Sequence, residues 1–171
     1  MYGYGLMAQA QKETLMNRER SAALLFVISA LLAMAICGLT RLSLPLPGVT
    51  GKLAGEIVFV LGMALFLWAV ISLKESFRGT VAPVSNRLVQ TGPYRWIRHP
   101  LYLSMIITLI GFALAFRSLW GLISIFAFFL PAVIFRAKLE EKALGEKFGS
   151  AWAEYARRTH FIIPFLDIWR V

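Results

Sequence analysis

Residues 98–141 decide the fold, and they read RHPLYLSMIITLIGFALAFRSLWGLISIFAFFLPAVIFRAKLEE. This stretch contains two apolar runs, 101–116 and 118–135, each close to the roughly 17 to 25 residues that cross a bilayer as a helix. Arg117-Ser118 joins the two runs without further residues between them, which predicts a tight turn and an antiparallel pair of helices. We therefore expect the two ends of the stretch to lie together at one side of a membrane.

Ionisable residues gather at the open end of this hairpin. Arg98 and His99 precede its first helix, and Arg136, Glu140 and Glu141 follow its second. Charged groups at the mouths of membrane helices are costly unless they pair with each other, reach water or bind a ligand. The sequence therefore predicts a buried polar site at this end.

The rest of the chain is also apolar. Of its 171 residues 58% are hydrophobic and 16% charged, the mean hydropathy is +0.68, and two further apolar runs cover 21–39 and 53–73. This composition excludes an ordinary soluble protein and predicts an all-α, polytopic membrane protein with four transmembrane helices. The only cysteine, Cys37, lies inside an apolar run, which excludes an intramolecular disulfide and indicates a packing role. We expect no metal site.

The distribution of positive charge predicts the topology. Of the 18 Lys and Arg residues only Arg41, Lys52 and Arg117 fall in the first and third loops, so the N-terminus, the middle connector and the tail are expected in the cytoplasm. A net charge of +9 could indicate nucleic-acid binding, but the basic residues are interleaved with the apolar runs, which argues against that partner. We expect an integral protein of the bacterial inner membrane with both termini cytoplasmic.

The sequence predicts a single domain in five parts. Leu144, Phe148, Trp152 and Tyr155 recur at helical spacing, so an amphipathic helix should follow the hairpin, with Gly149 as a possible division. Pro131 is either tolerated or bends the fourth span, and residues 161–171 should form a surface-associated tail. The parts are an interfacial segment 1–20, the first two spans 21–75, a cytoplasmic connector 76–100, the hairpin 101–136, and the amphipathic helix and tail 137–171.

A composite motif connects this site with a known family. The string LVQTGPYRWIRHPLY at 88–102, followed by Arg136, Glu140-Glu141 and Phe148-Gly149, resembles the isoprenylcysteine carboxyl methyltransferases, with the phospholipid N-methyltransferases close behind. The resemblance covers roughly residues 86–160. It implies that S-adenosylmethionine donates a methyl group to a lipid or lipid-linked acceptor at the cytoplasmic face. It assigns catalysis to Arg136 and Glu140, substrate binding to Arg136, and cofactor contacts to Leu88, Val89, Tyr94, His99, Pro100, Leu101, Tyr102 and Glu140.

The chemistry of the ligands suits these residue types. An anion such as Glu140 can pair with the cofactor's amine, and apolar side chains can surround its adenine. A carboxylate acceptor would use the planar fork of Arg136, whereas an amine acceptor would need a general base such as Glu141 or Tyr102. The chain departs from the isoprenylcysteine enzymes at Asn86, where they have histidine.

Simpler interpretations stand beside these. His99 could cap a helix, Arg98 could set topology, Arg136 could extend to lipid headgroups, and the glutamate pair could be solvated. Tyr94 and Trp96 could be interfacial aromatic anchors. At the level of the whole protein, the alternatives are a non-enzymatic membrane accessory protein and a nicotinamide-dependent membrane reductase. No glycine-rich dinucleotide motif supports the reductase.

Overall fold

The computed structural model describes residues 2–39, 44–45, 48–73 and 88–163, with side chains from residue 13 onward apart from residue 15. The expectations placed on Arg41, on residues 76–87 with Asn86, and on the tail after residue 163 lie outside these described residues. The described part is built from helices, with one isolated backbone bridge.

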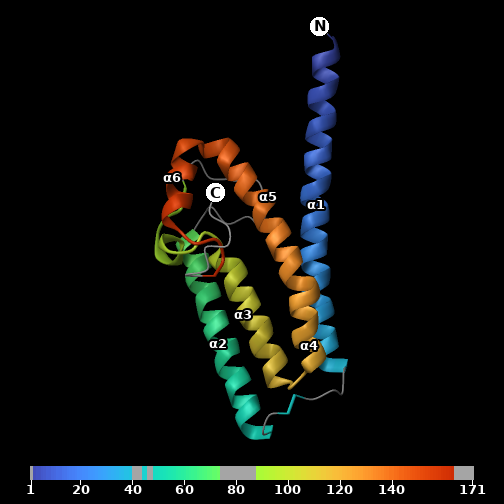
Figure 1. Ribbon diagram of the computed structural model, residues 1–171, viewed down its shortest axis with the longest axis vertical. Coiled ribbons are helices and arrows are strands. Elements are labelled where there is room, and N and C mark those ends of the chain that lie inside the picture. The colour runs from blue at the N-terminus through green and yellow to red at the C-terminus, as the bar shows by residue number, and fades with distance from the viewer. Residues whose placement is uncertain (1, 40–43, 46–47, 74–87, 164–171) are drawn as a thin grey trace.

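Four helical passes follow one another along the chain (Figure 1). The passes are α1 (Tyr2–Leu39), α2 (Gly48–Leu73), α3 (Pro100–Ala115), and a continuous helix made of α4 (Leu119–Ser124), the π-helical turn η3 (Ile125–Phe129) and α5 (Leu130–Phe148). A 3-10 turn, η2 (Gly92–Arg95), precedes α3, and α6 (Ser150–Arg158) follows α5. Successive passes run in opposite directions, which confirms the antiparallel hairpin and places the start of α3 and the end of α5 at the same side of the molecule.

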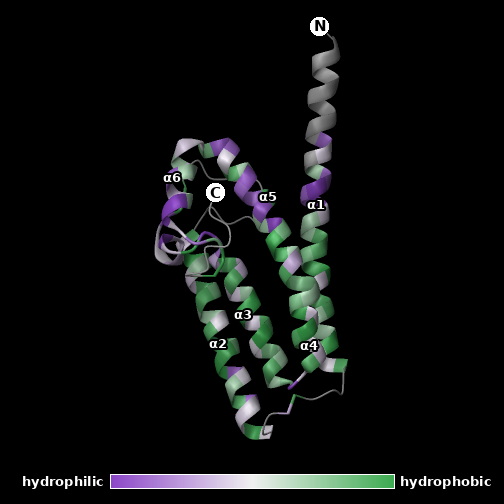
Figure 2. Ribbon diagram, in the orientation of Figure 1, coloured by the Kyte–Doolittle hydropathy of each residue, from purple (hydrophilic) through white to green (hydrophobic). Residues whose placement is uncertain are grey.

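Long apolar segments dominate the described residues. The helices Met16–Leu39, Gly48–Leu73 and Leu119–Phe148 are long and apolar enough to cross a membrane, and Pro100–Ala115 is a shorter apolar helix. Figure 2 shows hydrophobic residues along the passes, whereas hydrophilic residues gather where α5 meets α6. The predicted all-α, polytopic membrane architecture is therefore confirmed.

Helices α2 and α3 pack closely through glycine. A Cβ atom added at Gly55 would lie 2.2 Å from the backbone nitrogen of Ala115, and one added at Gly62 would lie 2.6 Å from that of Thr108. Gly111 of α3 makes the reciprocal approach, since its Cβ would lie 2.3 Å from the backbone nitrogen of Phe59. Small residues allow this contact between membrane helices, where packing rather than the hydrophobic effect drives association.

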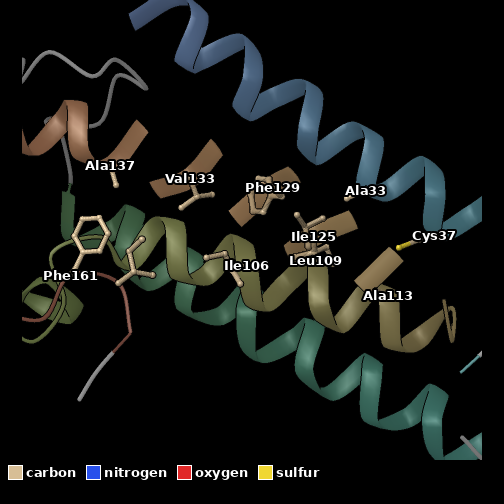
Figure 3. Close-up of a cluster of buried hydrophobic side chains, with 11 residues drawn as sticks. Ala33, Cys37, Ile106, Leu109, Ala113, Ile125, Phe129, Val133, Ala137 and Phe161 are labelled. Carbon is tan, nitrogen blue, oxygen red and sulfur yellow. The ribbon is translucent and has the colours of Figure 1, made fainter. Parts of the chain in front are cut away.

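The core lies between α1, α3 and the α4–α5 helix (Figure 3). Ile125, Phe129 and Val133 are fully buried there. Cys37 is 3% exposed and packs toward Gly121, where a Cβ atom would come within 2.2 Å of its sulfur, so its predicted packing role is confirmed.

The π turn lies directly before Pro131. The backbone N–H of Leu130 donates to the carbonyl of Ile125, five residues earlier. Proline has no N–H to continue the usual ladder and its ring crowds the carbonyl four residues before it, so a locally widened turn relieves the conflict. The disturbance expected at Pro131 thus takes the form of a π turn, and the helix continues beyond it.

Three expected boundaries differ in the structure. Helix α1 is continuous across residue 20, and α5 runs across residue 136 to Phe148 instead of ending with the apolar run. The break comes at Gly149, whose φ of 53° separates α5 from α6 as predicted. Phe161 and Ile162, expected in a surface tail, are 6% and 4% exposed because they pack into the main core.

Candidate functional site

His99 is held at the start of α3 by the residues around it. Pro100 is the first residue of the helix, where its fixed φ suits the helix and its missing N–H leaves nothing unsatisfied. The backbone N–H of His99 donates to the carbonyl of Phe161 at 3.2 Å, and that of Arg98 donates to His160 at 2.8 Å. The segment after α6 therefore fixes the backbone on which the His99 ring is carried.

Tyr94 is positioned by the η2 turn. Gly92 has a φ of 59°, and a Cβ atom there would lie 2.0 Å from the hydroxyl of Ser72, so only glycine fits between the turn and α2. The hydroxyl of Tyr155 donates to the backbone carbonyl of Tyr94 at 2.8 Å. Burial, reinforced by the nearby Glu140 carboxylate, raises the pKa of the Tyr94 phenol, which therefore stays neutral at physiological pH.

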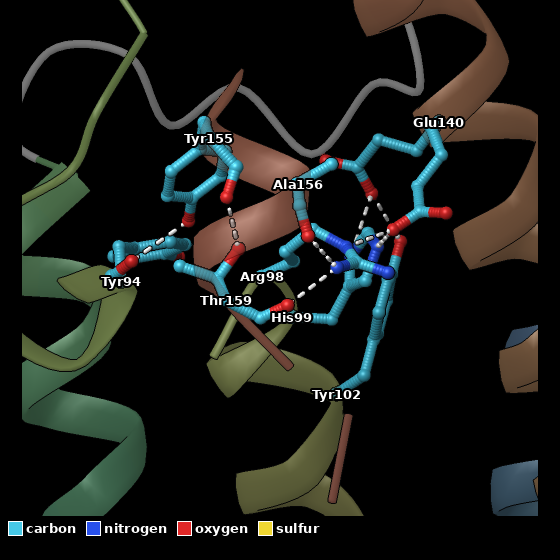
Figure 4. Close-up of polar contacts among 9 residues, drawn as sticks. Tyr94, Arg98, His99, Tyr102, Glu140, Tyr155, Ala156 and Thr159 are labelled. Atoms are coloured by element: carbon cyan, nitrogen blue, oxygen red, sulfur yellow. Dashed lines mark hydrogen bonds and ion pairs between the residues drawn. The ribbon is translucent and has the colours of Figure 1, made fainter. Parts of the chain in front are cut away.

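Tyr102 connects the two helices of the hairpin (Figure 4). Its hydroxyl donates to Oε2 of Glu140 at 2.9 Å and accepts from Nε of Arg136 at 3.0 Å. The His99 ring stacks on the Tyr102 ring with centroids 5.5 Å apart, and its Nδ1 lies 3.9 Å from Oε2 of Glu140. These four side chains form the polar cluster, which comes from the start of α3 and from α5.

Arg98 and Glu141 form a second, more buried connection. Nε of Arg98 donates to Oε1 of Glu141 at 2.5 Å, and Nη1 donates to the carbonyls of Ala156 at 2.8 Å and Thr159 at 2.6 Å. Nε2 of His99 lies 3.3 Å from the same carboxylate oxygen. The Arg98 side chain is 1% exposed, so this ion pair ties the start of α3 to both α5 and the end of α6.

The two neighbouring glutamates therefore differ in accessibility. Glu140 has a side chain that is 31% exposed, whereas that of Glu141 is 13% exposed and engaged by Arg98 and His99. Glu140 can take a ligand without breaking a buried ion pair, and Glu141 cannot.

The structure brings together four of the predicted site residues and places the others around them. His99, Tyr102, Arg136 and Glu140 make the polar cluster described above. Leu88 packs against Trp152 and Tyr155, in the cluster that also includes Leu144 and Phe148 and confirms the predicted amphipathic face. Of the remaining predicted residues, Pro100 and Tyr94 are buried, and Val89 and Leu101 are half-buried.

Two aromatic residues at the site are absent from the sequence prediction. The Phe161 ring meets the His99 ring edge-on with centroids 5.1 Å apart, and it lies 5.7 Å from Cζ of Arg98. Phe26 of α1 contacts Tyr102 and Arg136. The apolar run Phe161-Ile162-Ile163 indicates that Phe161 is buried. Phe26 is one of many apolar residues in its helix, so nothing in the local sequence singles it out.

An open groove of about 640 Å³ lies at the opposite end of the hairpin. It is lined by Lys52, Glu56, Phe59, Val60, Phe112, Ala115 and Phe116. The groove is next to the α3–α4 turn, so it is separate from the polar cluster at the start of α3. Among the residues that the structure describes, no three His, Cys, Asp or Glu side chains converge as metal ligands would.

Comparison of the sequence with known proteins identifies a family to which the chain belongs. The sequence profile of the phospholipid methyltransferases matches residues 51–151, which is more than half of the chain and includes the whole polar cluster. The chain belongs to the phospholipid methyltransferase family. Together with the long apolar helices, membership of this family makes the protein an integral membrane protein.

Several individual proteins are similar to this family member. The cobalt-zinc-cadmium resistance protein CzcN of Cupriavidus metallidurans is 38% identical over 89 residues, and the nickel-cobalt-cadmium resistance protein NccN of Alcaligenes xylosoxydans xylosoxydans is 36% identical over 89. Each match covers 50% of this chain and only 39% or 40% of the relative. A probable protein-S-isoprenylcysteine O-methyltransferase of Oryza sativa subsp. indica is 29% identical over 119 residues, which is 66% of this chain and 61% of that protein.

Proposed function

We propose that the protein transfers a methyl group from S-adenosylmethionine to a lipid or lipid-linked acceptor at the cytoplasmic face of a bacterial inner membrane. The observation that carries the proposal is the bridge made by Tyr102, which holds a cation, Arg136, and an accessible carboxylate, Glu140, beside His99. A group that recognises an anionic acceptor and a group that recognises a cationic donor are thereby adjacent. Family membership and the similarity to an isoprenylcysteine O-methyltransferase support the same chemistry.

The proposed topology has four spans and cytoplasmic termini. The third span is α3, whose 16 residues reach roughly 24 Å at about 1.5 Å per residue. The flanking residues of η2 and of the α3–α4 turn would complete its crossing. The five parts predicted from the sequence remain a functional division, in which the connector 76–100 and the end of the hairpin build the cofactor site.

The side chains around the polar cluster suit S-adenosylmethionine. Glu140 is an accessible anion for its ammonium group, and His99 and Tyr102 offer polar atoms for its carboxylate or ribose. Apolar surface for its adenine comes from Leu88, Val89, Tyr94, Pro100 and Leu101. When bound, the cofactor supplies an electrophilic methyl group on a sulfonium.

The protein's own residues then position the acceptor and exclude water. Arg136 is 8% exposed, so its guanidinium binds an acceptor anion in surroundings that weaken competition from water. The Tyr102 hydroxyl accepts from Nε of Arg136 and so fixes the orientation of the guanidinium. Because methyl transfer is an in-line displacement, holding the two reactants in alignment is the main task of the site. Glu141 is engaged by Arg98, which favours a carboxylate acceptor over an amine that needs this residue as a base.

Isothermal titration of the purified protein with S-adenosylmethionine tests the site. We expect the affinity to fall sharply in His99→Ala and Glu140→Ala and to be unchanged in Trp96→Ala, because Trp96 is 52% exposed and packs on Trp68 of α2. Equal binding by all three variants would remove the site assignment.

Two further measurements separate the alternatives. A thermal-shift comparison of S-adenosylmethionine, S-adenosylhomocysteine and NADPH should show stabilisation by the first two, since a ligand of the native state raises its stability. Stabilisation by NADPH alone would indicate the reductase, and binding without methyl transfer would indicate an accessory protein. Membranes are then incubated with labelled S-adenosylmethionine, and the labelled product is treated with base. A methyl ester releases its label and a methylamine does not, which distinguishes the two acceptors.

A further inference from the structure

His99 presents its two ring nitrogens to two different carboxylates. Nε2 lies 3.3 Å from Oε1 of Glu141, and Nδ1 lies 3.9 Å from Oε2 of Glu140. The shorter distance allows a hydrogen bond, whereas a separation of 3.9 Å is too long for one. The two nitrogens of the ring therefore have different roles.

Glu141 can act only as an acceptor towards His99. Its Oε1 also accepts from Nε of Arg98, and the carboxylate that pairs with this guanidinium is ionised and has acceptor oxygens only. Nε2 of His99 must then carry the hydrogen, because a bare nitrogen there would face a negatively charged oxygen. In a neutral imidazole this leaves the lone pair on Nδ1.

Two aromatic neighbours keep the His99 ring in this orientation (Figure 4). Tyr102 stacks on it with an interplanar angle of 28°, and Phe161 meets it at 78°. The His99 side chain is 3% exposed, so turning the ring over would displace these neighbours. It would also turn carbon atoms towards both carboxylates.

The free nitrogen and Glu140 form a pair of acceptors that suits an ammonium group. The Glu140 side chain is 31% exposed, so a small ligand reaches its carboxylate from outside. Two acceptors that share one tetrahedral ammonium through hydrogen bonds of about 2.9 Å lie roughly 4–5 Å apart. Nδ1 of His99 and Oε2 of Glu140 are 3.9 Å apart, which is close to that spacing.

We infer that Glu141 is a positioning residue, which fixes His99 as the tautomer with hydrogen on Nε2 so that Nδ1 accepts a hydrogen bond from the ammonium group of the cofactor. This inference rests on the proposed function, because it presumes S-adenosylmethionine at the polar cluster. It decides which end of the cofactor's amino-acid part His99 recognises. A nitrogen lone pair attracts the ammonium and repels the carboxylate.

NMR of the full chain in detergent micelles, with ¹⁵N-labelled histidine, measures the tautomer. The chain has two histidines, so His160→Gln leaves His99 as the only labelled ring. Ring nitrogens with a hydrogen and with a lone pair differ widely in chemical shift. In the ligand-free protein at alkaline pH we expect the lone pair on Nδ1. A lone pair on Nε2, or hydrogen on both nitrogens, would overturn the inference.

Two variants in the same background test the role of Glu141. Glu141→Gln keeps an acceptor oxygen for Nε2, because Nε of Arg98 still donates to that oxygen. Arg98→Met with Glu141→Leu removes the acceptor and leaves no charge unpaired. The first should keep the wild-type tautomer, and the second should give a mixture of both. A double variant that still shows only the wild-type tautomer would mean that Glu141 merely stabilises the fold.

Two analogues of S-adenosylhomocysteine test what His99 recognises. One lacks the carboxylate and keeps the amine, and the other lacks the amine and keeps the carboxylate. His99→Phe retains a flat ring between Tyr102 and Phe161 but removes both nitrogens. It should weaken binding of the amine analogue about tenfold, the effect of one lost hydrogen bond, and change binding of the carboxylate analogue less than about twofold. A loss confined to the carboxylate analogue would contradict the inference.

The two measurements separate this inference from the proposed function. The tautomer is read without any ligand, so the role of Glu141 stands if the predicted tautomer is found in a protein that binds no S-adenosylhomocysteine, and only the proposed function then fails. If S-adenosylhomocysteine binds and Nδ1 carries hydrogen, the proposed function stands and the inference fails.

Discussion

Glu140 and Glu141 are adjacent in the sequence but have different surroundings, which makes Glu140→Gln the sharpest single-residue test. The amide oxygen can still accept from Tyr102, so the fold should be kept, while the negative charge is lost. A hydrogen bond to a charged group contributes about 1.5–3 kcal/mol, so S-adenosylmethionine should bind about 10- to 100-fold more weakly. Titration calorimetry measures this, and an unchanged affinity would exclude Glu140 as the partner of the amine.

The Arg98–Glu141 pair should matter for stability more than for ligand contact. Arg98→Ala leaves Glu141 buried without its closest cation, and breaking a buried pair in this way costs about 3–5 kcal/mol. The double variant Arg98→Met with Glu141→Leu should be less destabilised than Arg98→Ala alone, because neither charge remains. Thermal unfolding in detergent measures both.

The exposed pair of Lys142 and Glu146 provides the control for that comparison. Its side chains are both 63% exposed, and Lys142→Ala should leave the melting temperature nearly unchanged. A fall in Lys142→Ala as large as in Arg98→Ala would contradict a special role for the buried pair.

At the scale of one residue, the sequence predicted contacts that the hairpin itself enforces. His99, Tyr102, Arg136 and Glu140 meet because the short turn at residues 116–118 makes α3 and the α4–α5 helix antiparallel, which brings the start of α3 beside α5. Phe26 and Phe161 were not predicted as neighbours of these residues. Their contacts depend on how α1 and the segment after α6 pack, and that packing is decided by many small apolar contacts over long sequence separations.

Among the helices, the α2–α3 contact is the tightest and the easiest to break. In Gly55→Leu the new side chain would have to occupy the position of the Ala115 backbone, so the helices must separate. Overpacking typically costs 1–3 kcal/mol, and a clash with rigid backbone should cost at least about 3 kcal/mol. Thermal unfolding and size-exclusion chromatography in detergent report the loss.

Gly38→Leu is the matched control for the glycine contact. Gly38 also belongs to an apolar helix, but a Cβ atom there meets nothing within 4 Å. This variant should unfold close to the melting temperature of the wild type, since the added side chain meets no other part of the described structure. Equal damage from both substitutions would indicate a general effect of the added leucine.

The π turn yields a prediction about the register of α5. A π turn holds one residue more than α-helical winding requires, so deletion of the exposed Ala127 should convert it to α-helix and keep Arg136 and Glu140 facing Tyr102. Deletion of Phe135 instead should rotate both residues by about 100°, because an α-helix has 3.6 residues per turn. Cofactor affinity should survive the first deletion and be lost in the second.

At the scale of elements, hydropathy located the apolar runs but not the ends of the helices. α5 continues past residue 136 because Ala137 to Phe148 consists mostly of good helix formers and contains no proline, and its single glycine, Gly145, does not end the helix. The change from apolar to amphipathic composition marks where the helix leaves the apolar layer, and it does not interrupt the backbone ladder. Gly55 and Gly62 of α2 and Gly111 of α3 make the close contacts between these helices. Composition alone does not show which helix each glycine packs against.

For the whole molecule, the charge distribution predicts which side each loop faces. In a Cys37→Ser background, Pro45→Cys should react with a membrane-impermeant maleimide in intact spheroplasts, whereas Arg18→Cys should react only after permeabilisation. Both positions are exposed, so access depends on the side of the membrane. The reverse labelling pattern would invert the topology and move the polar cluster to the outer face.

The carbonyls of Thr159, His160 and Phe161 receive hydrogen bonds from Arg98 and from the backbone of His99, although some sixty residues separate the partners along the chain. These carbonyls come after every apolar helix in the sequence. A chain shortened to end at Arg158 would therefore contain all the apolar helices but would lack the acceptors that hold Arg98 and His99, so it should still enter the membrane and should fail to form the site.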